Sequence, residues 1–146
     1  MAASRPVSWP PLLERLAALE EEREYGREAL AESVRVELSR LLNTRRSARP
    51  RLQPATVIDY GIADWSSLYA ERSDDRLRLA REIRTAVALF EPRLELQDLD
   101  VQPLDGRRHS LRVRLVGHLR DDTRRWPVAF VVDMAEELRV THERVD

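Results

Sequence analysis

The sequence contains no cysteine and no lysine, so all 25 of its basic side chains are arginines. Without cysteine there are no disulfides, no thiolate nucleophile and no cysteine-ligated zinc. Without lysine there is no lysine-dependent phosphate loop, no Schiff-base lysine and no Ser-Lys dyad. Only four glycines are present, and none forms a phosphate-binding loop or a Gly-x-Ser-x-Gly nucleophile elbow. These absences exclude several enzyme classes.

Long apolar runs and a strong net charge are also missing. No run approaches the ~20 apolar residues that cross a bilayer, and the N-terminus lacks an apolar signal-peptide core. The net charge of −1 gives no bulk attraction to nucleic acid or anionic lipid. The arginines of residues 44–56 have no interleaved aromatic side chains, which disfavours binding of single-stranded nucleic acid. We expect a cytoplasmic protein without nucleic-acid binding or direct membrane insertion.

The first half of the chain carries helical patterns. In an N-terminal arm, residues 1–26, leucines at helical spacing predict a short amphipathic helix that Gly26 ends. A longer helix is predicted over 27–43, with Asn43 as a plausible C-terminal cap. Another helix buries Leu79, Ile83, Val87 and Phe90. It must stop at Glu91, because Pro92 cannot continue it.

After Pro92 the apolar pattern alternates with a period of two residues. A phase slip at Gln97-Asp98 predicts a β-bulge, and Asp105-Gly106 predicts a hairpin turn. The segment 126–132 is apolar at nearly every position and should form the best-buried strand. The predicted fold is α+β, with two main helices packed on an antiparallel β-meander of about four strands, plus the short N-terminal helix. Residues 27–146 should form a single domain.

The tripeptide Glu91-Pro92-Arg93 lies where the helical pattern gives way to strands. Proline makes this a stiff corner, so its acid and guanidinium are held in place. One interpretation is a helix stop with a local ion pair. The other is a pair buried against another chain, where it would fix orientation.

No catalytic, metal or cofactor site is predicted. His109, His118 and His142 have no carboxylate or cysteine at ligand spacing. Carboxylates are abundant, but glycoside hydrolysis needs two of them facing each other across a sugar cleft. Glu91 beside Arg93 suits an ion pair better than a general acid.

Several segments together resemble the TssE family, small baseplate proteins of bacterial type VI secretion systems. This family is related to a wedge protein of contractile phage tails and carries a lysozyme-like label. The resemblance rests on order and spacing from about residue 12 to the last strand. The matching pieces are Leu12-Leu13-Glu14-Arg15-Leu16, Ser33-Val34-Arg35, Leu41-Leu42-Asn43-Thr44-Arg45, Asp59-Tyr60-Gly61-Ile62-Ala63-Asp64, Phe90-Glu91-Pro92-Arg93-Leu94 and Leu111-Arg112-Val113.

The resemblance implies a structural, non-enzymatic subunit. The Glu-Pro-Arg corner would hold it on a wedge built with TssF and TssG. An open sheet edge would accept strands of the sheath proteins TssB-TssC and so template the first sheath ring. TssK and the spike hub are further expected partners, at a baseplate docked on the inner-membrane complex. The implied partner-binding residues are Glu91, Pro92, Arg93, Asn43, Thr44, Arg45, Tyr60, Gly61, Leu138 and Val140, the last two on the C-terminal edge.

Two other functions stay open at this point. The lysozyme-like label suggests a peptidoglycan hydrolase, which a carboxylate pair in one cleft would support. A small regulatory adaptor domain would share the size and composition of this chain. The identity of the binding partner separates the adaptor from the baseplate subunit.

Overall fold

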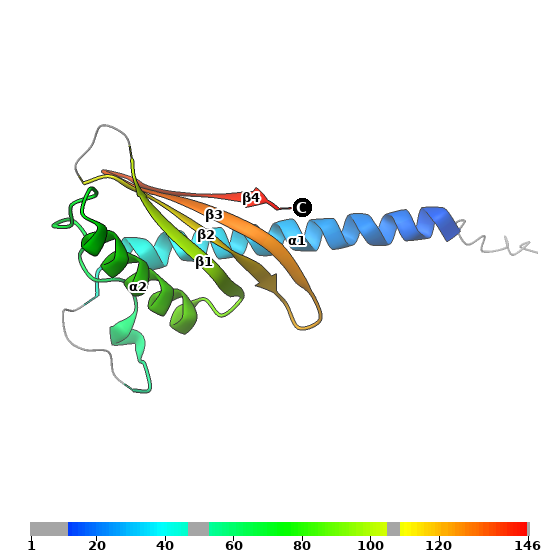
Figure 1. Cartoon of the computed structure of the whole chain (residues 1–146). Helices are drawn as coiled ribbons and strands as arrows, with labels where there is room; N and C mark the ends of the chain where they lie inside the picture. Colours follow the sequence, from blue (N-terminus) through cyan, green and yellow to red (C-terminus); the bar gives the residue numbers. More distant parts are fainter. Residues whose placement is uncertain (1–11, 47–52, 105–108, 146) are drawn as a thin grey trace, which may run out of the picture.

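The computed structural model describes residues 12–46, 53–104 and 109–145 (Figure 1). Helix α1 spans Leu12–Asn43, a 3-10 turn η1 spans Val57–Asp59, and helix α2 spans Ser73–Phe90. The strands β1 (Leu94–Pro103), β2 (Leu111–Arg120), β3 (Arg125–Met134) and β4 (Leu138–Arg144) form an antiparallel sheet in the order β1-β2-β3-β4. The predicted α+β fold, with its helices before a meander, is confirmed.

One continuous helix replaces the predicted break at Gly26. Helix α1 runs through this glycine for 32 residues, so the short N-terminal helix does not exist as a separate element. A glycine inside a helix costs about 1 kcal/mol relative to alanine, which the strong helix formers around it can outweigh. The boundary predicted between arm and domain therefore falls inside α1, and it stays a prediction.

Both helices cover the same face of the sheet. Along β2 the side chains alternate between buried residues, such as Val113 and Leu115, and outward residues, such as Arg112 and Arg114. Helix α1 packs against β4 and β3, and α2 packs against β1. The core lies between these helices and the sheet, with Phe130 of β3 fully buried at its centre. Arg125 is the only exposed residue of β3, and each of the other three strands has more exposed residues, so the prediction that 126–132 forms the best-buried strand is confirmed.

The β-bulge predicted at Gln97-Asp98 is confirmed, because the β1–β2 register shifts between Leu96 and Asp98. The bulged backbone comes so close to β2 that a Cβ on Gly117 would lie 2.1 Å from the Glu95 carbonyl oxygen. Glycine is therefore required at position 117. The predicted turn residues Asp105-Gly106 lie outside the described residues.

Helix α1 is much longer than the sheet it packs on. Its N-terminal half extends beyond the sheet, away from α2 (Figure 1). Within the described ranges, neither helix is apolar enough over a sufficient length to cross a membrane.

Candidate functional site

The Glu91-Pro92-Arg93 corner connects the end of α2 to the start of β1. The Glu91 N–H donates the last helical hydrogen bond, to Val87 O at 2.9 Å, and Leu94 N–H donates to Glu91 O at 3.2 Å. Arg120 N–H of β2 donates to Arg93 O at 2.8 Å. The helix stop was thus correctly predicted, and the backbone of the corner is fixed on both sides.

Glu91 and Arg93 form a bidentate ion pair within the chain. Arg93 Nε donates to Glu91 Oε1 at 2.9 Å, and Nη2 donates to Oε2 at 2.8 Å. The Glu91 side chain is only 1% exposed, whereas 39% of the Arg93 side chain is exposed. The bond to Glu91 raises the pKa of Arg93, which stays charged. The buried acid therefore orients a guanidinium that the surface presents.

Helix α1 supplies the third side of the corner. Arg93 Nη1 donates to Ser33 Oγ at 2.8 Å, sixty residues away in sequence. One turn further along α1, Glu37 Oε1 accepts a hydrogen bond from the Tyr60 hydroxyl at 2.6 Å. The Tyr60 ring meets Phe90 edge-on, with centroids 5.2 Å apart. Burial is the largest cause of the raised pKa of Tyr60, and the hydrogen bond to Glu37 is the second largest. Tyr60 thus joins the corner to α1.

Next to Tyr60, backbone hydrogen bonds join the segment after α1 to the segment after η1, and both segments contain predicted partner-binding residues. Ile62 N–H donates to Thr44 O at 2.9 Å, and Arg46 N–H donates back to Ile62 O at 2.9 Å. Gly61 has φ of +106°, and a Cβ there would lie 2.3 Å from Thr44 O. Thr44 and Gly61 are therefore committed to contacts within the chain, while Asn43 and Arg45 are exposed.

The sequence analysis missed three side chains of this region. Ser33 appeared there only within a segment of the family resemblance, and no role was predicted for Glu37 or Glu82. Glu82 in fact accepts from Arg46 Nε at 2.5 Å and from Ala63 N–H at 3.0 Å. These contacts join segments far apart in sequence, so no local spacing could have revealed them.

A shallow cavity of about 300 Å³ lies beside Pro92, between α2 and β1. Its apolar lining includes Ala88 and Leu96, and its rim carries the arginines Arg84 and Arg120. Among the described residues neither arginine side chain has an acidic partner. The corner thus offers a rigid proline, an apolar hollow and arginine side chains on one surface.

One hydrogen bond shows which backbone N–H and C=O groups are unpaired at the free edge of β4. Arg120 N–H donates to Arg93 O, so the backbone N–H and C=O groups of the even-numbered residues of β2 point along the sheet toward β1. Antiparallel pairs alternate between bonded and non-bonded, so the registers carry this alternation across the sheet. The N–H and C=O groups of even-numbered residues in β4, such as Val140 and His142, therefore face outward.

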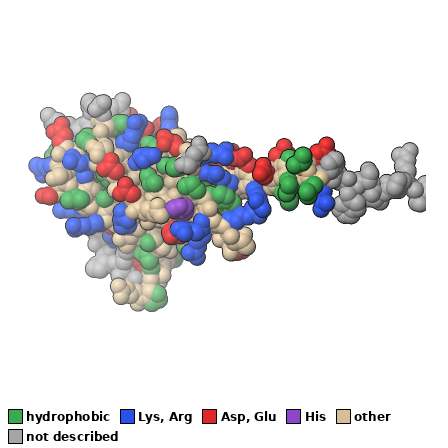
Figure 2. Space-filling model, turned by 45° about the vertical axis from the view of Figure 1, so that its right-hand side comes forward, with side chains coloured by type: hydrophobic (Ala, Val, Ile, Leu, Met, Phe, Trp, Pro, Cys, Tyr) green, Lys and Arg blue, Asp and Glu red, His purple; other side chains and the backbone are tan. Residues whose placement is uncertain are grey.

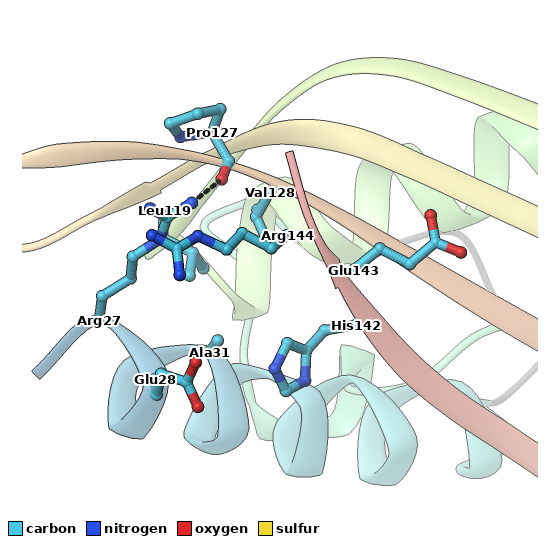
Figure 3. A pocket seen from close by; sticks show the side chains of 9 residues that line it. All are labelled: Arg27, Glu28, Ala31, Leu119, Pro127, Val128, His142, Glu143 and Arg144. Carbon is cyan, nitrogen blue, oxygen red and sulfur yellow. Dashed lines mark hydrogen bonds between the residues drawn. The ribbon is translucent and has the colours of Figure 1, made fainter. Parts of the chain in front are cut away.

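Two arginines of α1 bind outward carbonyls along this edge. Arg35 Nη1 donates to Val140 O at 3.4 Å. Beyond the end of β4, Arg27 Nη2 donates to Pro127 O at 3.1 Å, at a cavity of about 230 Å³ between α1 and the sheet (Figure 3). Glu28 and Glu143 also line this cavity, but their carboxylates point in different directions (Figure 3). They do not face each other as glycoside hydrolysis requires.

The opposite edge, at β1, is poorly suited to accept a strand. It carries the bulge at Leu96/Asp98, and by the same alternation its last residue, Pro103, faces outward without an N–H. Bulges and prolines are features that protect edge strands from pairing. The strand β4 has neither feature. It contains Leu138 and Val140, the two residues expected on the C-terminal edge; the side chain of Val140 is buried in the core and that of Leu138 is partly buried, so the edge offers their backbone groups.

No group of histidines and acids suited to a metal ion occurs in the part of the chain that the structure describes. His118 is on the outward face of β2, where its Nδ1 is buried without a hydrogen-bond partner among the described atoms.

Comparison with known proteins identifies the family. Residues 28–124 match the family described as baseplate wedge protein gp25, which is well over half of the chain. The chain therefore belongs to the gp25 baseplate wedge family, which is also the family of TssE. It is a baseplate component of a contractile injection machine. Curated proteins and solved structures gave no significant match. The matched range includes the corner and Tyr60, but neither β4 nor residues 12–27.

Proposed function

We propose that this protein is the TssE subunit of a type VI secretion baseplate, and that its role is structural and not enzymatic. The Glu91-Pro92-Arg93 corner binds the wedge formed by TssF and TssG, and the β4 edge accepts sheath strands. The observation that carries the proposal is the arrangement of Arg93, whose guanidinium is partly exposed while a buried carboxylate fixes its direction. Preorganised guanidinium groups suit specific polar contacts at protein interfaces.

The free edge of β4 supports the proposal that the protein templates the sheath. Strand addition uses a row of outward backbone groups, and β4 presents such a row without a proline or bulge. A TssB-TssC strand added there would have to displace Arg35 from the Val140 carbonyl. The subunit would then act in the cytoplasm, at a baseplate docked on the inner-membrane complex, near TssK and the spike hub.

A cross-linked pull-down from the native bacterium tests the proposal. Tagged wild-type protein should recover TssF, TssG and sheath proteins, while Arg93→Ala should lose TssF and TssG. The matched control is Arg78→Ala, an exposed arginine of α2 outside the corner. Equal recovery by all three proteins would refute the role of the corner. Failure of the wild type to recover any secretion component would refute the assignment, and a peptidoglycan-cleavage assay would then test the hydrolase alternative.

A further inference from the structure

The projecting half of α1 carries an apolar surface that the fold does not use. We call Leu12, Leu13, Leu16 and Leu19 the leucine stripe. Leu12 and Leu13 are 67% and 80% exposed, and Leu16 and Leu19 are about half exposed. Figure 2 shows hydrophobic side chains gathered on this projecting part, with acidic and basic side chains around them. A helix of this length gains little stability without packing of its apolar face.

The leucine stripe continues the face with which α1 packs on the sheet. Eighteen residues make five full turns of an α-helix, so residues 12, 13 and 16 have the same phase as residues 30, 31 and 34. At those positions Ala31 and Val34 are buried and Leu30 packs against the core. The same helix face is thus covered beside the sheet and uncovered beyond it.

A hollow marks the point where α1 leaves the sheet. This cavity of about 280 Å³ is lined by Trp126 at the start of β3, by Arg144 at the end of β4, and by Glu20, Arg23, Glu24 and Arg27 of α1. The Arg144 guanidinium pairs with Glu24 at 2.5 Å. A partner element lying along the leucine stripe would therefore run toward the half-buried indole of Trp126.

Charge selects among the possible occupants. Residues 12–25 carry five glutamates and two arginines, a net charge of −3. Two copies of this segment would bring like charges together beside the leucines, which disfavours self-pairing. Glu20 and Glu24 follow Leu16 by one and two turns, and so lie beside the stripe. The complementary surface is an apolar stripe flanked by basic side chains.

We propose that the leucine stripe binds an amphipathic helix of a partner protein whose apolar stripe is flanked by lysine or arginine. Helix pairing of this kind uses apolar side chains at spacings of three and four residues. The surface lies outside the family match and is separate from the Arg93 corner. The inference therefore goes beyond the proposed function and does not depend on it.

The test uses the full chain and two synthetic 21-residue helical peptides. Both have leucine at heptad positions a and d, one with lysine and the other with glutamate at e and g. Fluorescence anisotropy should show the lysine peptide binding at least tenfold more tightly than the glutamate peptide. A Leu16→Ser/Leu19→Ser variant should lose at least tenfold in affinity for the lysine peptide. The matched control Ala17→Ser/Ala18→Ser places the same serines off the stripe and should bind as the wild type does.

Three results would overturn the inference. The first is equal binding of both peptides, or wild-type binding by the Leu16→Ser/Leu19→Ser variant. The second is a wild-type dimer in sedimentation that this variant dissolves, since the occupant would then be a second copy. The third is a combination of two observations: the wild type binds neither peptide, and the Leu16→Ser/Leu19→Ser variant unfolds several degrees below the wild type. The chain itself would then cover the leucine stripe. Arg93→Ala should bind the lysine peptide normally, so failure of the proposed function remains distinguishable.

Discussion

The Glu91 carboxylate is enclosed by the fold, whereas Arg93, which it holds through two hydrogen bonds, reaches the surface. The two interpretations of the tripeptide are therefore not exclusive. The ion pair is local, as the interpretation of a helix stop predicts. Its effect is nevertheless to orient the Arg93 guanidinium toward the surface. A partner would meet Arg93 and Pro92, and would not reach Glu91 directly.

Arg93→Ala should destabilise the protein by about 2–3 kcal/mol, because it leaves a buried carboxylate without its charged partner. The partial exposure of Arg93 keeps the loss below the largest values for buried pairs. Urea denaturation measures it. The double variant Glu91→Gln/Arg93→Gln should lose less, because no unpaired charge remains. A loss under 0.5 kcal/mol for Arg93→Ala, roughly that of a surface change, would argue against the enclosed carboxylate.

Gly61→Ala should destabilise the joint between α1 and η1 by at least about 2 kcal/mol. The residue has φ of +106°, and the added Cβ would lie 2.3 Å from Thr44 O. Gly26→Ala is the matched control, because nothing lies within 4 Å of its added Cβ and the backbone is helical. That variant should gain about 0.5–1 kcal/mol. Thermal unfolding of both proteins compares them, and an unchanged midpoint for Gly61→Ala would contradict the strained joint.

Tyr60→Phe should cost about 1 kcal/mol, since it removes the hydroxyl bond to Glu37 and keeps the ring contact with Phe90. The raised pKa of Tyr60 means that the fold favours the neutral phenol. Its contribution to stability is complete below the unfolded pKa of about 10 and is lost as the pH rises above that value. Denaturation at pH 8 and pH 11 should show a smaller alkaline loss for Tyr60→Phe than for the wild type. If both proteins lost the same free energy of unfolding between pH 8 and pH 11, Tyr60 would not be the cause of the alkaline loss.

His142→Pro should block strand addition at β4 without disrupting the sheet. The N–H of His142 faces outward by the alternation of the sheet, so proline removes an edge donor and no bond to β3. His142→Ala is the control, because it also loses the ring but keeps the N–H. Sheath assembly in cells, followed with a fluorescent sheath subunit, should persist in His142→Ala and stop in His142→Pro. Normal sheaths in both variants would place strand addition elsewhere.

The fold could be predicted from local patterns because each element carries its own signal. The change of period at Pro92 located the strands, and the phase slip at Gln97-Asp98 located the bulge. Gly26 misled the prediction, because a local rule for breaking helices was weighed without the propensity of its neighbours. The roles of Ser33 and Glu37 could not be predicted, since each depends on a partner that only the tertiary fold brings close.

The affinity of purified TssF–TssG, from the same genome, for Arg93→Gln tests the central claim most directly. Glutamine removes the positive charge and the planar guanidinium but retains a polar side chain of moderate length. Calorimetry should show binding at least tenfold weaker than wild type, at a temperature where both proteins are folded. Arg78→Gln, on the exposed face of α2, should bind normally. Wild-type affinity for Arg93→Gln would contradict the claim that the corner presents Arg93 to the wedge.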